Sequence, residues 1–360
     1  MMHDNPSRWT RFRRNALAMG GVVFIVCCVL VVLAGPFIRP DDTIHANHQQ
    51  LVLSRMKPMS TVSVVRVPRE HEPVSWWKKW IDGGADPAFD EVPVTVFDSE
   101  SGNRLVAPID EADTTRFASL AMRSGAGWTV SADHIVEKRF ILGTDKYGRD
   151  VLSRLMAGTA VSLSVGAIAV LISLLVGLTL GLLAGYYRGW VDAFIMWFTN
   201  VVWAVPTLLL VMAITFAFGT GFWKVFLAVG LTMWVEVARI TRGQVLSVRE
   251  KEYVEAARAI GLPDRRIIFR HILPNILSPI IVISAANFAS AILIEAGLSF
   301  LGLGAQIPTP SWGNMIREHY AYLTTDLAYL AIVPGVMIML LVLSFMMIGN
   351  GLRDALDVRR

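Results

Sequence analysis

The sequence predicts an all-α polytopic membrane protein with six transmembrane helices and a small α+β extracytoplasmic insertion. Of its 360 residues, 54% are hydrophobic and only 17% are charged, whereas soluble domains carry about 25% charged residues. Several apolar runs reach the roughly 20 residues that a helix needs to cross a bilayer. Between the first two runs, apolar and polar residues alternate in the way typical of half-buried strands.

Six apolar runs are expected to span the membrane. They cover residues 16–38, 160–186, 194–217, 223–241, 277–300 and 328–349. In the second run, Gly177, Gly181 and Gly185 recur every four residues, and small residues at this spacing let helices approach closely in lipid. The alternative is that these glycines only face lipid. Pro206 and Pro334 fall inside spans, where we expect neighbouring helices to satisfy the freed carbonyl groups.

The first run, 16–38, is too long for the apolar region of an ordinary signal peptide, so we expect an uncleaved anchor. Both cysteines, Cys27 and Cys28, lie inside this run. No disulfide is therefore expected in the polar remainder of the chain.

Basic residues collect at alternate ends of the apolar runs. They are Arg8, Arg11, Arg13 and Arg14 before the first run, Arg188 after the second, Arg242, Arg249, Lys251, Arg258, Arg265, Arg266 and Arg270 after the fourth, and Arg353, Arg359 and Arg360 after the sixth. The short loops on the other side offer only Lys224 and Arg317. The positive-inside rule predicts that both termini are cytoplasmic. The net charge of +4 is explained by this placement, so nucleic-acid binding is not expected.

The segment 39–141 is predicted to be an extracytoplasmic insertion. Within it, "STVSVVRVP" and "EVPVTVF" read as strands. The stretch "SWWKKW" contains Trp76, Trp77 and Trp80. These rings could anchor at the membrane interface, where Trp is enriched, or they could pack inside a small α+β cap.

The cytoplasmic loop 242–275 is polar although apolar runs lie on both sides of it. Strong helix formers predict a short helix over 252–260, and Gly261 is a natural stop signal after it. Pro263 suits the first turn of a second helix, roughly 263–272. Pro274 is expected to break that helix before the next span.

The first helix of this loop is thin on one side, because Ala256 and Ala257 carry only methyl groups. Glu255 and Arg258, three residues apart, are expected to flank this face. Such a helix suits docking into a groove of another protein. The alternative is an amphipathic helix that lies on anionic lipid of the inner leaflet.

The stretch "EAARAIG…HILP" resembles the EAA loop of ABC-importer permeases. The matching residues are Glu255, Ala256, Ala257, Gly261, Leu273 and Pro274, with the family spacing. His271 departs from the pattern, which has Ile at this place. The stretches 142–166 and 295–316 resemble the dipeptide/oligopeptide/nickel subgroup, and the closest resemblance is to its second, C-type permease.

This resemblance covers about 142–357 and implies a type I ABC-importer permease domain over 142–360, after a tail and first helix in 1–38. In that family the EAA loop is a coupling helix that sits in a cleft of the ATP-hydrolysing subunit. The implied partners are two ABC ATPase subunits, a second homologous permease, an extracytoplasmic solute-binding protein and the lipid bilayer. ATP and Mg²⁺ would be bound by the ATPase partners, and no cofactor is expected in this chain. The implied location is the bacterial inner membrane.

Motifs for chemistry in this chain are absent from the sequence. There is no G-x-x-x-x-G-K-[ST] loop, no H-E-x-x-H and no G-x-S-x-G, so neither ATP hydrolysis nor other catalysis is expected here. His45 and His48 are three residues apart and could ligate a metal, but a solvated polar loop explains them better.

Ionisable residues inside apolar runs are candidate functional residues, because they are costly in lipid. Glu236 has Arg239 and Arg242 as expected structural partners. Glu295 lies deeper, with Asn287 two turns earlier on roughly the same face. Glu295 could line a translocation path or satisfy a buried hydrogen bond, and Asn287 is a candidate for the same path.

Just outside the second span, "TDKYGRD" places Asp145, Arg149 and Asp150 together. The simpler interpretation is a helix entry, with Asp145 as the cap and local ion pairs around it. The alternative is an outer gate or part of a docking surface for a binding protein.

The main hypothesis is a permease subunit of an ATP-driven importer, with di- or oligopeptides as the substrate that the resemblance implies. Two alternatives belong to other classes. One is an ion-coupled secondary transporter that uses Glu295 as its relay. The other is a membrane scaffold that transports nothing and displays the extracytoplasmic insertion.

Overall fold

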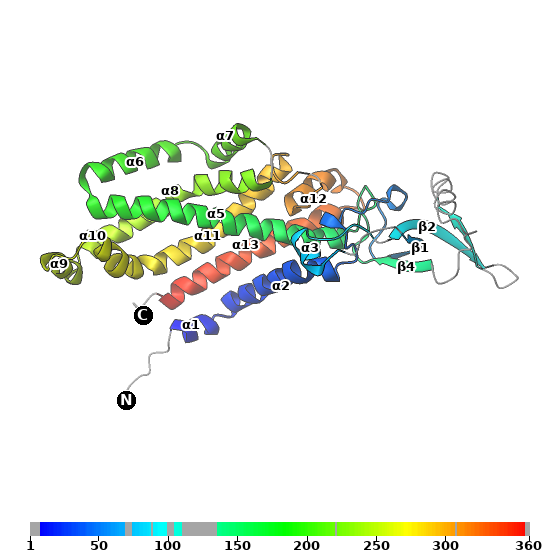
Figure 1. The fold of residues 1–360 in the computed structure, drawn as a ribbon, viewed down its shortest axis with the longest axis horizontal. Helices are drawn as coiled ribbons and strands as arrows, with labels where there is room; N and C mark the ends of the chain where they lie inside the picture. The colour runs from blue at the N-terminus through cyan, green and yellow to red at the C-terminus, as the bar shows by residue number, and fades with distance from the viewer. Residues whose placement is uncertain are drawn as a thin grey trace, which may run out of the picture.

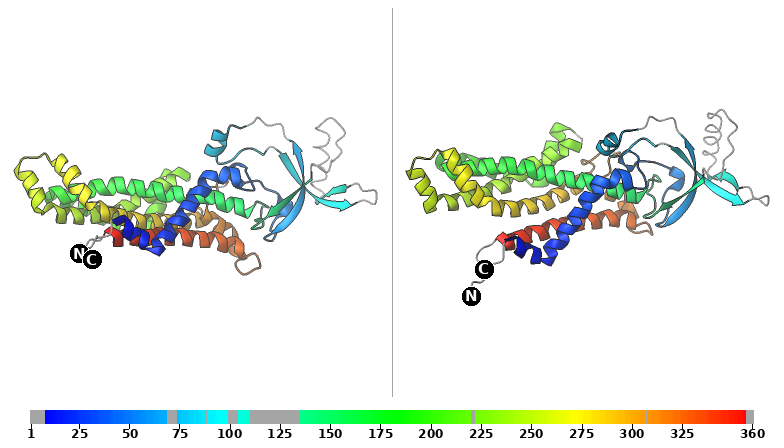
Figure 2. Two further views of the ribbon diagram at one scale, coloured as in Figure 1. Left: turned by 90° about the horizontal axis from the view of Figure 1, so that it is seen from below. Right: turned by 60° about the horizontal axis from the view of Figure 1, so that its bottom comes forward.

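A computed structural model describes residues 8–68, 74–87, 89–98, 104–109, 135–219, 222–306 and 308–356. A long helical bundle carries a β-sheet at one end and the short helix α9 at the other (Figure 1). Helix α1 and the end of α13 lie toward the α9 end of the bundle (Figures 1 and 2). The predicted cytoplasmic segments are therefore grouped at one end, and the predicted extracytoplasmic insertion is at the other.

The described helices follow the chain in this order. They are α1 (Arg8–Arg14), α2 (Ala16–Ile38), α3 (Trp76–Ile81), α5 (Val151–Tyr187), α6 (Gly189–Trp203), α7 (Thr207–Phe218), α8 (Phe222–Arg249), α9 (Glu252–Ala259), α10 (Asp264–Arg266), the π-helix η4 (Ile267–Ile272), α11 (Leu273–Phe300), α12 (Trp312–His319) and α13 (Tyr329–Leu356). Short 3₁₀ turns, η1 (Ile44–Ala46), η2 (Leu51–Leu53) and η5 (Tyr320–Tyr322), occur in the connections.

The predicted fold class is confirmed, but six crossings is an approximate count. Among the described residues, four helical segments are long and apolar enough to span a membrane: α2, α5, the continuous stretch from α10 to α11, and α13. The pair α6 and α7 makes a fifth crossing if the two are taken together. Helix α8 carries more charge, yet it runs beside α5 (Figure 1), so we count it as the sixth.

The third predicted span is not one helix. Its two parts, α6 and α7, are bent by 91° at a break around Pro206, which precedes the first residue of α7. Proline has no backbone N–H, and its ring clashes with the preceding helical turn. The expectation that residues 194–217 form one straight span was therefore wrong. Pro334, by contrast, lies inside the uninterrupted helix α13.

The predicted break at Pro274 is also wrong. The chain is helical from Asp264 through the π-helix η4 into α11, and Pro274 occupies the first turn of α11. In the π-helix each N–H bonds five residues back, as Leu273 does to Ile268. This wider turn lets the helix continue through Pro274, which has no backbone N–H to donate.

Helices α5, α8, α11 and α13 are longer than the apolar runs that predicted them, and the extensions of α5 and α8 are the largest. Helix α5 begins nine residues before the predicted start at 160, because Asp150 caps it by accepting a hydrogen bond from the N–H of Ser153 at 2.8 Å. Helix α8 continues past 241 to Arg249. Both extensions project beyond the apolar segment and carry the polar sites described below.

Helices α5 and α8 pack closely along the predicted glycine face. A Cβ added at Gly177 or Gly181 would lie 2.5 Å from the Cβ of Val237 or Thr241, and one at Gly185 would lie 2.7 Å from that of Val245. These distances are shorter than any normal carbon contact. The prediction of close helix approach is confirmed.

The insertion contains a four-stranded antiparallel sheet in the order β3-β2-β1-β4. Its strands are β1 (Ser60–Pro68), β2 (Phe89–Asp98), β3 (Arg104–Pro108) and β4 (Ile135–Phe140). Both strands predicted from alternation are confirmed as β1 and β2. Val62, Val64 and Phe140 form a small core with Leu53, which ties the sheet to the segment that follows α2.

The tryptophans of α3 do not form a cap core. Trp76 and Trp77 are each 58% exposed, and Trp80 is 42% exposed. The Nε1–H of Trp80 donates to the carbonyl of Leu33 on α2 at 3.2 Å. Their position beside the end of α2 favours the interfacial anchor over the packed cap.

The α5–α8 contact predicts a large effect from one methyl group. Gly181→Ala should lower the thermal unfolding temperature of the purified protein, because its Cβ would meet the Thr241 Cβ and the Ala238 carbonyl. Overpacking of this kind costs about 1–3 kcal/mol. The matched control is Gly243→Ala in α8, whose Cβ would meet nothing within 4 Å. Equal unfolding temperatures for the two variants would contradict the close packing.

Candidate functional site

The cytoplasmic loop forms a short helix, a sharp turn and a second helix, as predicted. Helix α9 ends at Ala259, and Gly261 follows with φ +77°. The N–H of Gly261 bonds the Arg258 carbonyl at 2.9 Å, and the N–H of Leu262 bonds the Ala257 carbonyl at 3.2 Å. This left-handed C-terminal cap requires glycine for its backbone conformation.

The two alanines of α9 lie on different faces of the helix. Ala257 is buried in a cluster with Val254, Ile267 and Ile272, so it holds α9 against the helix that follows. Ala256 is exposed. The expectation that both methyl groups form one docking face was therefore wrong, because successive residues on a helix are about 100° apart. The exposed face of α9 includes Ala256 and Glu255.

Arg258 also lies elsewhere than predicted. Its guanidinium carbon is 5.1 Å from the ring centre of Tyr186, whose hydroxyl donates to Asp264 Oδ1 at 2.6 Å. Arg258 thus helps to fasten α9 and α10 to the end of α5. It does not flank the exposed face together with Glu255.

Beside α9, the second helix presents a basic hollow of about 510 Å³ to the surface. Its lining residues are Pro263, Arg265, Arg266, Phe269 and Arg270. Phe269 is 58% exposed. The predicted motif residues Leu273 and Pro274 follow one turn later, the first half-buried and the second exposed. The loop therefore combines a thin helix with an exposed basic and aromatic surface.

Glu295 and Asn287 lie together on α11, but both are 1% exposed. Glu295 Oε1 accepts a hydrogen bond from Ser299 at 2.6 Å, and Ser311 bonds Ser299 in turn at 3.1 Å. Neither Glu295 nor Asn287 reaches a surface of this chain. For Glu295 the geometry favours the buried hydrogen bond over the path-lining role, whereas the buried Nδ2 of Asn287 has no hydrogen-bond partner among the described residues.

The expected partners of Glu236 bind other residues. Arg242 makes two hydrogen bonds to Asp192, at 2.5 and 2.6 Å. Arg239 donates to Asn200 at 2.6 Å. The prediction that these arginines pair with Glu236 was wrong, and they join α8 to α6 instead.

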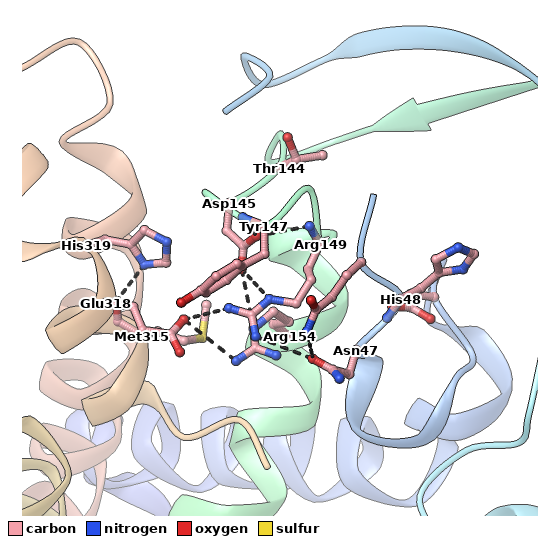
Figure 3. Close-up of polar contacts among 12 residues, drawn as sticks. Asn47, His48, Thr144, Asp145, Tyr147, Arg149, Arg154, Met315, Glu318 and His319 are labelled. Atoms are coloured by element: carbon pink, nitrogen blue, oxygen red, sulfur yellow. Dashed lines mark hydrogen bonds and ion pairs between the residues drawn. The ribbon is translucent and has the colours of Figure 1, made fainter. Parts of the chain in front are cut away.

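At the other end of the bundle, a buried ionic network joins the start of α5 to α12 (Figure 3). Arg149 donates from Nε to Asp145 and from Nη2 to Glu318 of α12, both at 2.6 Å. Arg154 lies 3.8 Å from Asp145 and 4.0 Å from Glu318. The local ion pair predicted for Asp145 and Arg149 is confirmed.

The sequence predicted Asp145 as the N-cap of this helix, but the N-cap of α5 is Asp150. Asp145 accepts from the N–H groups of Tyr147 and Arg149, at 2.8 and 3.0 Å, and so closes the turn before the helix. Burial raises the pKa of the Asp150 carboxyl, against the hydrogen bonds from Ser153.

Asp145, Glu318 and His319 bring oxygen and nitrogen atoms within 4.8 Å of one another, a spacing that a metal ion could use. Arg149 already bonds both carboxylates. A guanidinium therefore supplies the positive charge that a cation would supply, and we assign no metal here. Among the described residues, His45 and His48 are not part of any such group.

Sequence reasoning missed Glu318 and Arg154, which complete this network, and Tyr186 and Asp264, which fasten α9. Glu318 lies 169 residues after its partner Arg149. No local spacing signals such a contact. Tyr186 lies in an apolar run, where a tyrosine hydroxyl needs a polar partner, and that need was the one available signal.

The network predicts a loss of stability in acid. Burial lowers the pKa of His319, while its contact with the Met315 carbonyl and the nearby Asp145 and Glu318 act in the opposite direction. His319 is therefore protonated at a higher pH in the unfolded chain than in the folded protein. The stability due to neutral His319 is present above about pH 6.5 and is lost as the pH falls further.

We therefore expect the thermal unfolding temperature to fall as the pH is lowered from about 7.5 to about 5.5. The fall corresponds to at most about 1.4 kcal/mol per pH unit from this group. His319→Asn should unfold with a flatter pH dependence. An identical pH profile for the variant and the original protein would rule out His319 as the source.

Two family models match the chain. Residues 177–360 match the binding-protein-dependent transport system inner membrane component, and residues 7–58 match the N-terminal transmembrane domain of oligopeptide transport permease C. The strands lie between these two matched segments.

Relatives extend this similarity. A glutathione transport system permease protein from Pectobacterium atrosepticum is 44% identical over 216 residues, which cover 60% of this chain and 71% of that protein. A dipeptide transport system permease protein from Alkalihalophilus pseudofirmus is 45% identical over 215 residues, covering 60% and 70% respectively.

Among solved structures, an inward-facing form of a methionine ABC transporter matches with a TM-score of 0.48 and 17% identity, over 58% of this chain and 98% of that chain. The first family model covers more than half of the chain, and the two relatives are each matched over more than two thirds of their length. The chain therefore belongs to the binding-protein-dependent transport system inner membrane components, the multi-pass permease subunits of bacterial ABC importers.

Proposed function

We propose that this permease takes up di- or oligopeptides and that α9 is the segment through which ATPase subunits drive it. The observation that carries the proposal is the form of α9. This helix projects at the end of the bundle (Figure 1), exposes Ala256, and is fixed by the Gly261 turn and by the Tyr186–Asp264 bond. A thin and rigid element of this kind fits a groove on a partner.

The peptide substrate is inferred from the relatives, whose names refer to glutathione and dipeptides. The path would form between this chain and a second, homologous permease. A solute-binding protein would deliver the peptide at the sheet end of the bundle. Both termini would be cytoplasmic, in accord with their basic residues and with α1 and α13 ending on the α9 side (Figure 2).

Two ATPase subunits would bind ATP and Mg²⁺, and their closure would move α9. Helix α8 leads directly into α9, and the helix from Asp264 to Phe300 leads away from it. A displacement of α9 would therefore act on two long helices at once. Because α8 is packed against α5 without space for one methyl group at Gly181, these helices would move together as a unit.

The ion-coupled alternative depends on Glu295 as a relay. That side chain is buried and bonded to Ser299. It does not reach a surface of this chain from which it could take up a proton. The scaffold alternative offers no reason for the exposed Ala256 beside a glycine-capped turn. The importer accounts for both features.

The docking role of α9 predicts that Ala256→Trp abolishes peptide uptake and binding-protein-stimulated ATP hydrolysis by the assembled complex in proteoliposomes. The bulky ring would separate α9 from the ATPase groove, and the exposed position leaves the fold of this chain intact. Ala257→Trp is a poorer test, because Ala257 is buried and its loss would disturb internal packing.

The control is Arg353→Trp, which puts the same ring on an exposed position of α13. It should keep normal uptake and normal ATP hydrolysis. The proposal fails if Ala256→Trp retains both activities. Uptake that persists without ATP but collapses with an uncoupler would favour the ion-coupled alternative.

A further inference from the structure

A hollow of about 350 Å³ lies where the third span is broken. It is bordered by Trp203 and Thr207 at the α6–α7 break, by Thr232 and Glu236 of α8, and by Ser290 of α11. Three separate helical segments thus contribute polar groups to one place. Discontinuous helices in transporters commonly form substrate sites near the middle of the membrane.

Glu236 lies at membrane depth. It is six residues before Arg242, which pairs with Asp192 at the predicted cytoplasmic edge, and fourteen residues after the start of α8 at Phe222. At 1.5 Å per residue these intervals are about 9 and 21 Å. Their sum is close to the roughly 30 Å of a hydrocarbon core, so Glu236 lies inside the bilayer.

At this depth Glu236 is exposed on the surface of the chain, and no hydrogen bond or ion pair within the described part of the chain holds its carboxylate. A carboxylate facing lipid would be strongly unfavourable. Its position is compatible with a membrane only if it faces a water-filled passage or a positively charged group.

The first two arginines that follow Glu236 on α8 do not provide that group. Arg242 is held by Asp192. Arg239 donates to Asn200, and its guanidinium carbon lies 4.1 Å from the ring centre of Trp203. Since both guanidinium groups are directed to other partners, the hollow retains the negative charge of Glu236, with hydroxyl groups of Thr207 and Ser290 around it.

Building on the proposed function, we propose that this hollow is a substrate-contacting site of the translocation path, in which Glu236 binds the amino-terminal ammonium group of the peptide. An ammonium donates three hydrogen bonds, which the carboxylate and the neighbouring hydroxyls can accept. The hollow has space for the end of a peptide, whereas a single ion pair with a neighbouring subunit would need none. Arg239 positions Trp203 as one wall of the site.

The first test compares Glu236→Gln with the original protein in the complete complex, reconstituted in proteoliposomes with its binding protein and tripeptide. We expect kcat/KM for uptake to fall by about tenfold or more, the effect of losing a charge-assisted hydrogen bond. ATP hydrolysis stimulated by the binding protein should remain, and Glu236→Asp should recover part of the uptake. The control Asp354→Asn makes the matching change on an exposed carboxylate of α13 and should transport normally.

Unchanged uptake by Glu236→Gln would overturn the assignment. Failure of Glu236→Gln to co-purify with a second permease would overturn it too, since Glu236 would then be a contact between subunits. If the original complex itself transports no peptide, the proposed function has failed instead. The two failures are therefore distinguishable.

The second test leaves Glu236 in place. Thr207→Cys, in a complex whose Cys27 and Cys28 are replaced by Ser, is modified with a positively charged methanethiosulfonate reagent. Tripeptide should slow this reaction, and the N-acetylated tripeptide, which has no ammonium group, should not. Equal protection by both peptides, or protection by neither, would contradict the site.

Discussion

The close contact between α5 and α8 is the constraint on which the rest of the structure depends. Three glycines of α5 leave no space for a methyl group against α8, so the two helices are in direct backbone contact along this face. The turn just before α5 and Arg154 in its first turn form the ionic network with α12 (Figure 3). The extended end of α8 leads into α9. The contact thus connects the two polar ends of the molecule through the membrane.

Charged groups in this chain are handled in two different ways. At the sheet end, Asp145, Arg149 and Glu318 satisfy one another inside the protein, which joins the turn before α5 to α12. Removing one member of such a network would leave a buried charge without its partner, at a cost of about 3–5 kcal/mol. Glu236, in contrast, is exposed in the middle of α8. The first arrangement stabilises the fold, and the second requires something outside this chain.

Much of the fold could be predicted from the sequence because its signals are local. The first span was predicted with the bounds that α2 has, and the glycine face and the Gly261 turn were identified from spacing alone. The errors have a common physical cause. Pro206 and Pro274 look alike in sequence, but one lies at a break and the other follows a π-helical turn. Only the surrounding packing distinguishes them.

The candidate site was predicted in part. The motif located α9. The sequence did not reveal that Ala257 is buried and Ala256 is exposed, because the two are adjacent residues of the same type. The partners of Arg239 and Arg242 were misassigned because Asn200 and Asp192 lie on α6, 39 and 50 residues away in the sequence. The hollow beside Glu236 was not predicted because it is bordered by the break between α6 and α7, which the sequence did not reveal.

The most direct measurement is photo-crosslinking from a benzophenone amino acid placed at position 256 in the intact membrane. The account predicts a covalent product with an ATP-hydrolysing subunit, and a yield that changes when ATP is bound. The same probe at position 257, which faces inward, should form products within this chain. Crosslinks from position 256 to phospholipid alone would contradict the account, because α9 would then lie on the membrane surface without contacting an ATP-hydrolysing subunit.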